Sequence, residues 1–96
     1  MEITFDNIVG KTILVGLTYL SKDGDELERT QFWGTIKQAQ EGGLITIHNA
    51  NTNEEFTLPP DLHSFRITEP GEYRLRSTGE SVVNPDLTTT WTIYKP

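Results

Sequence analysis

The stretch ILVGLTYL, residues 13–20, decides the fold class of this chain. Every second position in it is apolar, namely Ile13, Val15, Leu17 and Tyr19. Alternation with a period of two is typical of a β-strand that buries one face, so we expect Tyr19 to point inward with the other three. Gly16 and Thr18 interrupt the run, which is also shorter than the roughly 18 apolar residues that a membrane-spanning helix needs.

The same alternation recurs along the rest of the chain. Seven further strands are marked by alternate positions. They contain Phe32, Gly34 and Ile36; Ile45 and Ile47; Phe56 and Leu58; Phe65 and Ile67; Tyr73 and Leu75; Val83; and Trp91 and Ile93. Turn signals rich in Gly, Asn, Asp and Pro separate these strands. Residues 59–65 open with two prolines and predict one short 3₁₀ turn. We therefore expect an all-β fold.

Composition limits the class of protein further. The chain has 96 residues, 8 Lys+Arg and 14 Asp+Glu, which gives a formal charge of 8 − 14 = −6, and it contains no cysteine. These values predict a single domain over residues 1–96 and exclude a disulfide scaffold, a cysteine metal site and thiol catalysis. An acidic balance also argues against nucleic acid as a partner. With no export signal or membrane segment in the sequence, we expect a cytoplasmic protein.

The order of the predicted elements resembles the SH3-like small β-barrel plan. A long strand precedes a long acidic loop, and strands joined by a Gly-rich and an Asn-rich turn follow it. The segment LPPDLHSFRI, residues 58–67, is similar to the 3₁₀ turn and last strand of that fold, and LTYL at residues 17–20 is similar to the start of peptide-binding SH3 domains.

The resemblance implies a particular architecture. It predicts a five-stranded barrel over residues 8–69, on which residues 70–96 pack as a C-terminal β-hairpin extension. An Sm-like small barrel is the competing strand order. Because one fold supports many functions, neither plan fixes what the protein does.

The sequence offers no convincing catalytic or metal-binding constellation. Asp61, His63 and Ser64 have the residue types of a hydrolase triad, but three groups within four positions rarely converge as a triad requires. We expect Asp61 to cap the 3₁₀ turn and Ser64 to satisfy local backbone. His48 follows the strand position Ile47 and is expected on the surface, outside any metal site. We therefore expect neither an enzyme nor a cofactor.

The best candidate for function is a partner-binding surface. An acidic loop would steer a partner protein, expected to be basic, and an aromatic residue would anchor it, so the predicted partner-binding residues are Asp23, Asp25, Glu26, Glu28 and Trp33. Trp33 lies opposite the Phe32 face, where either it is exposed or the C-terminal extension covers it. The sequence thus predicts a non-catalytic protein-interaction module.

Three alternatives remain beside this prediction. They are an immunity-type acidic inhibitor of a basic toxin, a homo-oligomeric structural subunit and a small hydrolase. Among the basic residues, the only cluster contains three arginines that alternate with glutamates, and we expect cross-strand ion pairs among Arg66, Arg74, Arg76, Glu69, Glu72 and Glu80.

Overall fold

The computed structural model describes residues 2–95, and strands account for most of the regular structure. In chain order the elements are α1 (Phe5–Ile8), β1 (Thr12–Leu20), β2 (Glu26–Gln38), β3 (Ile45–Asn49), β4 (Glu55–Leu58), η1 (Leu62–Ser64), β5 (Phe65–Ile67), β6 (Glu72–Arg74), β7 (Ser81–Val83) and β8 (Leu87–Tyr94). The predicted all-β class in one small domain is confirmed, as is the 3₁₀ turn η1 before β5. Within the described range, no helix has the length and apolar character needed to cross a membrane.

The short helix α1 lies outside the predicted elements. Its N-terminus is a capping box, in which Asn7 N donates to Thr4 Oγ1 at 3.1 Å and Thr4 N donates to Asn7 Oδ1 at 3.0 Å. These two bonds satisfy backbone donors that a single helical turn otherwise leaves free. This helical turn places the fully buried side chain of Ile8 in the core.

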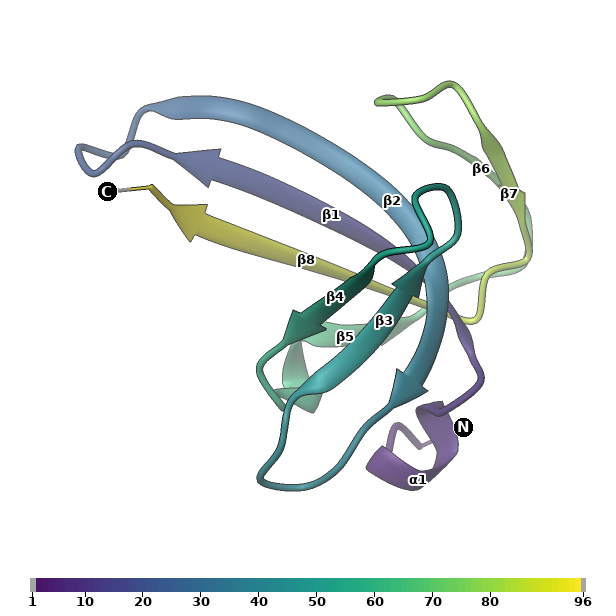
Figure 1. The fold of residues 1–96 in the computed structure, drawn as a ribbon. Helices are drawn as coiled ribbons and strands as arrows, with labels where there is room; N and C mark the ends of the chain where they lie inside the picture. The colour runs from purple at the N-terminus through teal and green to yellow at the C-terminus, as the bar shows by residue number, and fades with distance from the viewer. Residues whose placement is uncertain (1, 96) are drawn as a thin grey trace.

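Six strands form one sheet in the order β4-β3-β2-β1-β8-β5, and β6 and β7 form a separate hairpin (Figure 1). All neighbours in the sheet are antiparallel except β1 and β8, which run parallel. A parallel neighbour requires a crossover connection. Here that connection is residues 21–86, and the β6–β7 hairpin lies in its last part, between the antiparallel neighbours β5 and β8.

The last strand is the main difference from the predicted architecture. β8 lies inside the sheet, between β1 and β5, whereas residues 70–96 were expected to pack on a barrel from outside. The sheet therefore has six strands rather than five, and it is not closed. The physical reason is length, because β5 pairs with only three residues of β8, whereas β8 pairs with β1 from Ile13 to Leu20.

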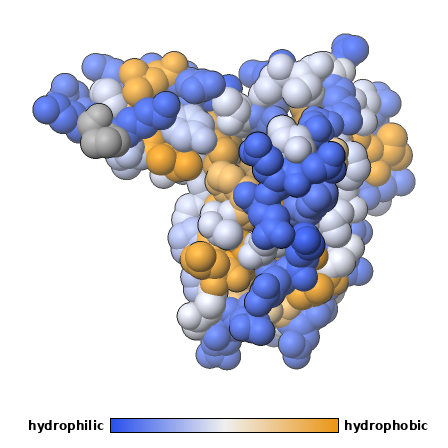
Figure 2. All heavy atoms as spheres, viewed as in Figure 1, coloured by the Kyte–Doolittle hydropathy of each residue, from blue (hydrophilic) through white to orange (hydrophobic). Residues whose placement is uncertain are grey.

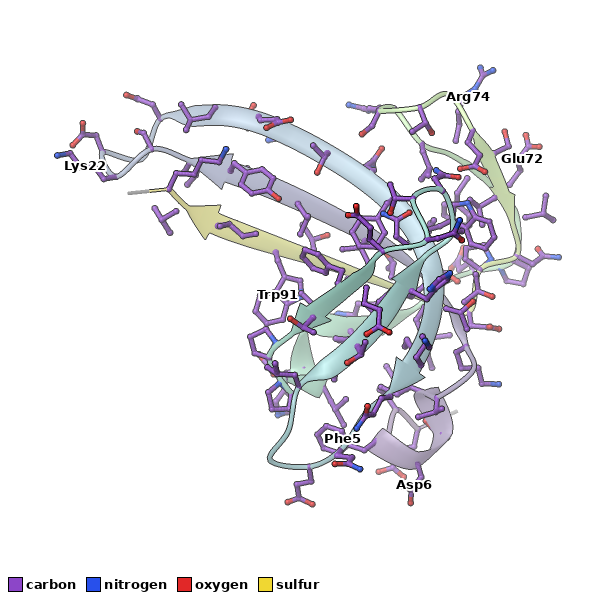
Figure 3. All side chains as sticks on the ribbon, viewed as in Figure 1. Phe5, Asp6, Lys22, Glu72, Arg74 and Trp91 are labelled. Carbon is purple, nitrogen blue, oxygen red and sulfur yellow. The ribbon has the colours of Figure 1, made fainter. Side chains whose placement is uncertain are left out.

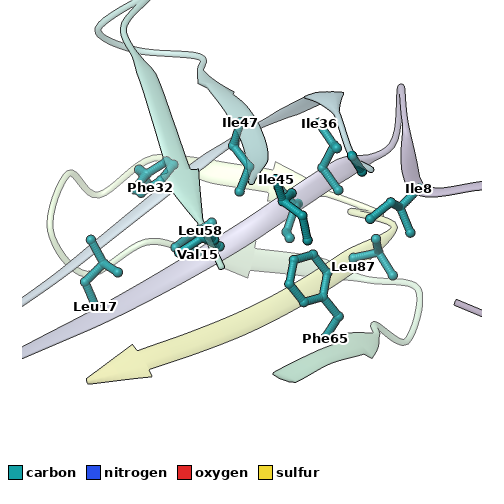
Figure 4. Close-up of a cluster of buried hydrophobic side chains, with 12 residues drawn as sticks. Ile8, Val15, Leu17, Phe32, Ile36, Ile45, Ile47, Leu58, Phe65 and Leu87 are labelled. Atoms are coloured by element: carbon teal, nitrogen blue, oxygen red, sulfur yellow. The ribbon is translucent and has the colours of Figure 1, made fainter. Parts of the chain in front are cut away.

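The core lies on one face of the curled sheet (Figure 4). The predicted alternation in β1 is confirmed, since Ile13, Val15 and Leu17 are buried and Tyr19 packs against the core while half-buried. Strands from both ends of the sheet contribute to the same cluster, whose other buried members are Ile8, Phe32, Ile36, Ala39, Ile45, Ile47, Leu58, Phe65 and Leu87. One apolar cluster thus holds the sheet together.

The β6–β7 hairpin covers part of the opposite face. Leu75 and Val82 are buried although they lie outside the main core cluster. The turn that follows β6 is attached to β2, because Gln31 N donates to Ser77 Oγ at 2.7 Å and Arg76 N donates to Gln31 Oε1 at 2.7 Å. The hairpin is therefore fixed against the sheet at its far end.

Candidate functional site

The ends of β1, β2 and β8 project beyond the other strands and form a three-stranded arm, defined here as residues 17–20, 26–30 and 90–94 (Figure 1). Pairing of β2 with β3 begins only at Gly34, and pairing of β8 with β5 ends at Thr89. Both outer edges of the arm therefore lack a neighbouring strand within the described part of the chain. Unpaired strand edges are templates for pairing with another chain.

The free edge of β8 has a defined set of backbone groups. Lys95 N donates to Leu20 O at 2.8 Å, which shows that the backbone groups of the odd-numbered residues in this part of the chain point toward β1. By alternation, the N–H and C=O groups of Thr92 and Tyr94 point away from β1, beyond the end of the pairing with β5. Both residues are exposed. An extended peptide can therefore hydrogen-bond along this edge without displacing any strand.

Apolar side chains flank that edge on both faces of the arm. Tyr19, Trp91 and Ile93 lie on the core side and are half-buried. On the other face Tyr94 is 64% exposed, whereas Leu27, at the bulge in β2, is 55% exposed at the opposite edge of the arm. Figure 2 shows hydrophobic surface on two sides of the arm, and in Figure 3 Trp91 lies beneath β8 on the side of β4.

The acidic loop forms the tip of the arm. The turn is held by Asp25 N, which donates to Ser21 Oγ at 3.1 Å, and by Gly24, whose φ of 92° is accessible to glycine at low cost. The four predicted acids are all exposed, but only Asp23 and Asp25 lie in this turn, which is shorter than the predicted acidic loop, because Glu26 and Glu28 belong to β2 and pair with β1. Glu26 also forms an exposed ion pair with Arg29 at 2.7 Å.

Trp33 lies away from the acidic tip of the arm. It is seven residues from Glu26 along β2, roughly 23 Å at the rise of a strand. Its side chain is half-buried on the hairpin side of the sheet, two residues from the anchor Gln31, and its Nε1 is buried without a hydrogen-bond partner. The structure thus brings the four acids together but does not place Trp33 on the same surface.

Trp91 is the aromatic residue that the prediction passed over. Its Nε1 donates to Thr89 Oγ1 at 3.0 Å, and Thr89 in turn donates to Ser64 O at 3.0 Å, which fixes the indole at the base of the arm. A signal for it was present, because Trp91 and Tyr94 fall on opposite faces of one strand. At least one of the two rings then has to face away from the core.

The residues of the apparent triad have the structural roles expected for them. Asp61 Oδ1 accepts from His63 N at 3.0 Å and caps η1, while Ser64 Oγ donates to Asp61 O at 2.8 Å. His48 lies on the outward side of β3, with its Nε2 3.3 Å from Asn53 Oδ1. Among residues 2–95, no group of three His, Asp or Glu side chains is placed to hold a metal ion.

The arginines are not paired as predicted. The ion pairs among the described residues are Arg29–Glu26 and Lys37–Glu55, so the expected cross-strand pairs of Arg66, Arg74 and Arg76 do not form. Arg66 instead donates through Nη1 to the carbonyl oxygens of His63 and Phe65. Cross-strand pairing fails because β6 and β7 leave the main sheet and pair only with each other.

Comparison with known proteins adds no functional assignment. No protein-family model, curated protein or solved structure matches the chain. The functional argument therefore rests on the arm, which combines an unpaired strand edge, apolar flanks and an acidic tip.

Proposed function

We propose that the protein is a non-catalytic interaction module that binds a basic partner protein through the arm. The observation that carries the proposal is the free edge of β8 at residues 90–94, with apolar side chains on both of its faces. Arms of this kind are costly to leave exposed, because unpaired edges and apolar flanks promote association.

Recognition then has three physical contributions. Backbone groups of Thr92 and Tyr94 pair with an extended segment of the partner. Apolar side chains of that segment pack against Trp91 and Ile93, which supply most of the affinity. Finally, the tip steers the encounter, since residues 21–28 contain four acids and one lysine.

We further propose that the sheet is a variant of the SH3-like barrel plan. The consecutive antiparallel pairing of β1 through β4, followed by η1 and β5, supports this relationship. In this proposal β8 is inserted between β1 and β5 and leaves the barrel open. A sequence without cysteine also suits a reducing compartment, and we place the interaction in the cytoplasm.

The variant Thr92→Pro tests the mode of binding. Proline removes an N–H that points away from β1, so it blocks strand addition while leaving the β1–β8 ladder intact. The matched control Thr92→Val keeps the N–H. Wild type and Thr92→Val should capture the same basic protein from a lysate of the source organism, whereas Thr92→Pro should not, at an unchanged melting temperature. Equal capture by the correctly folded proline variant would refute the proposal.

A homo-oligomeric subunit is the second candidate, because the same free edge can pair two copies of the chain. Sedimentation velocity over a range of concentrations separates the two functions. A monomer at all concentrations excludes the oligomer. A dimer that Thr92→Pro dissociates would instead identify the second copy as the partner of β8.

A further inference from the structure

A second surface, independent of the arm, has the features of a small-molecule site. A groove of about 470 Å³ lies between the hairpin turn and the face of the sheet that points away from the core. Its lining residues are Gly16, Leu17, Thr18, Arg29, Thr30, Gln31, Arg76, Ser77 and Thr90. The volume falls in the range of roughly 300–1,000 Å³ that is typical of ligand clefts.

The groove is preformed. Its floor is the sheet, where Gly16 lies between Gln31 of β2 and Thr90 of β8. Its wall is the turn after β6, which the two 2.7 Å hydrogen bonds at Gln31 attach to β2. A third bond, from Asn51 Nδ2 to Glu80 Oε1 at 3.0 Å, attaches the other side of the same turn. A ligand therefore needs no rearrangement of the hairpin.

The lining is cationic and rich in hydroxyl groups, although the chain as a whole carries a charge of −6. Its charged residues are Arg29 and Arg76, and no Asp or Glu is among its lining residues, although Glu26 pairs with Arg29 at 2.7 Å. Arg76 forms no ion pair among residues 2–95. The face of the sheet between them carries the hydroxyls of Thr18 and Thr90. Glu26 partly compensates Arg29, so Arg76 is the groove cation without an ion pair among the described residues, and acids farther away are screened beyond about 8 Å at physiological salt.

Gly16 supplies the second line of evidence. Glycine inside a strand costs about 0.5–1 kcal/mol relative to alanine, so its presence needs a reason. Packing does not supply one, because a Cβ at Gly16 would meet Thr90 Oγ1 at an ordinary 3.7 Å. By contrast, a Cβ at Gly34 would lie 2.1 Å from His48 O. Gly16 instead leaves the floor of the groove open, which allows a ligand to approach the backbone closely.

We infer that this groove binds a small phosphate-bearing polyol. Arg76 holds the phosphate, which matches the planar fork of a guanidinium group, and Arg29 joins it by exchanging its contact with Glu26 for the phosphate. The threonine hydroxyls and the side-chain NH₂ of Gln31 bond to the ligand hydroxyls. A flat part of the ligand lies over Gly16.

Titration of ¹⁵N-labelled protein with glucose 6-phosphate tests the inference, with glucose and inorganic phosphate as separate arms. The amide signals of Gly16, Gln31 and Ser77 should shift saturably with glucose 6-phosphate, more weakly with inorganic phosphate and not at all with glucose. Signals of the β8 edge at Thr92 should not move. The inference is overturned if glucose 6-phosphate shifts none of the groove amides, or if glucose binds as tightly as glucose 6-phosphate.

Three variants sharpen this test. Arg76→Gln should weaken binding at least about tenfold, because a charge-assisted bond is lost. Lys22→Gln, which makes the same change of charge at the tip of the arm, should leave the affinity unchanged. Gly16→Val should abolish binding and also raise the melting temperature, since valine favours a strand. Equal loss of affinity in the Arg76→Gln and Lys22→Gln variants would show that the ligand is attracted by charge alone and would refute the groove as its site. Undiminished binding by a folded Gly16→Val variant would refute it as well.

Discussion

Replacement of Gly34 by alanine is the most direct test of how β2 and β3 pack. Gly34 is buried in β2, where it pairs with Asn49 of β3. A Cβ at this position would lie 2.1 Å from His48 O, 2.9 Å from His48 C and 3.1 Å from Ile47 Cγ2. The first two are backbone atoms, so no side-chain rotation relieves the contact. The variant must separate the two strands locally.

The expected cost follows from that separation. Overpacking a well-packed site costs about 1–3 kcal/mol, and each backbone hydrogen bond weakened between β2 and β3 adds about 1 kcal/mol. Alanine restores about 0.5–1 kcal/mol relative to glycine through the entropy of the unfolded chain. The net loss for Gly34→Ala is thus about 2 kcal/mol, which for a domain of this size lowers the melting temperature by roughly 8–16 °C.

Gly16→Ala is the matched control, because it makes the same chemical change in the neighbouring strand β1. A Cβ at Gly16 would make only ordinary van der Waals contacts, so Gly16→Ala lowers the entropy of the unfolded chain without a steric cost in the folded state. Thermal unfolding followed by circular dichroism should show Gly34→Ala well below wild type and Gly16→Ala at or slightly above it. If the two variants shift the melting temperature in the same direction, the argument from close approach at Gly34 is wrong.

Two further predictions concern the core and its buried hydroxyl. Phe65→Ala should lower the free energy of unfolding by about 3–5 kcal/mol in urea denaturation, because Phe65 is 2% exposed and packs the edge strand β5 against the common core. Thr89→Val should cost about 1–3 kcal/mol despite its similar size, since it leaves Trp91 Nε1 and Ser64 O without their partner; an unchanged stability would show that water replaces the hydroxyl.

Much of the fold could be predicted from local patterns. The alternation in residues 13–19 identified the buried face of β1, and the prolines before Asp61 identified η1. Both features depend on neighbours in the chain. The exposure of Asp23 and Asp25 was equally predictable, because a turn between two strands exposes its polar side chains, whereas the placement of Glu26 and Glu28 in the loop was wrong, since both belong to β2.

The long-range arrangement could not be predicted in the same way. Period-two alternation shows that β8 buries one face, but it does not show which strand is its neighbour. The parallel pairing of β8 with β1 joins two strands that are separated by residues 21–86, and no local sequence pattern identifies that pairing. For the same reason the arm could not be predicted, since it follows from where pairing with β3 and β5 stops, whereas the distance of Trp33 from the acids follows from the start of β2 at Glu26, where the sequence indicated a loop.

The connection from β5 to β8 also links the two proposed sites, and this link can be tested through Gln31. The β6–β7 hairpin delivers β8 to its place beside β1 and also forms the wall of the groove. Gln31→Ala removes the acceptor for Arg76 N and so releases one anchor of that wall. Loss of one exposed hydrogen bond costs about 0.5–1.5 kcal/mol, which is too little to unfold the sheet.

The consequence should be local. Hydrogen exchange at residues 72–83 should accelerate in Gln31→Ala, and the affinity for glucose 6-phosphate should fall, while capture of a protein partner by the β8 edge stays the same. Gln38→Ala serves as the control, because Gln38 also lies on β2 but is exposed and outside the groove. Faster exchange at residues 90–94 as well would mean that the hairpin holds β8 in the sheet, and the groove and the arm would then be one coupled unit rather than two independent sites.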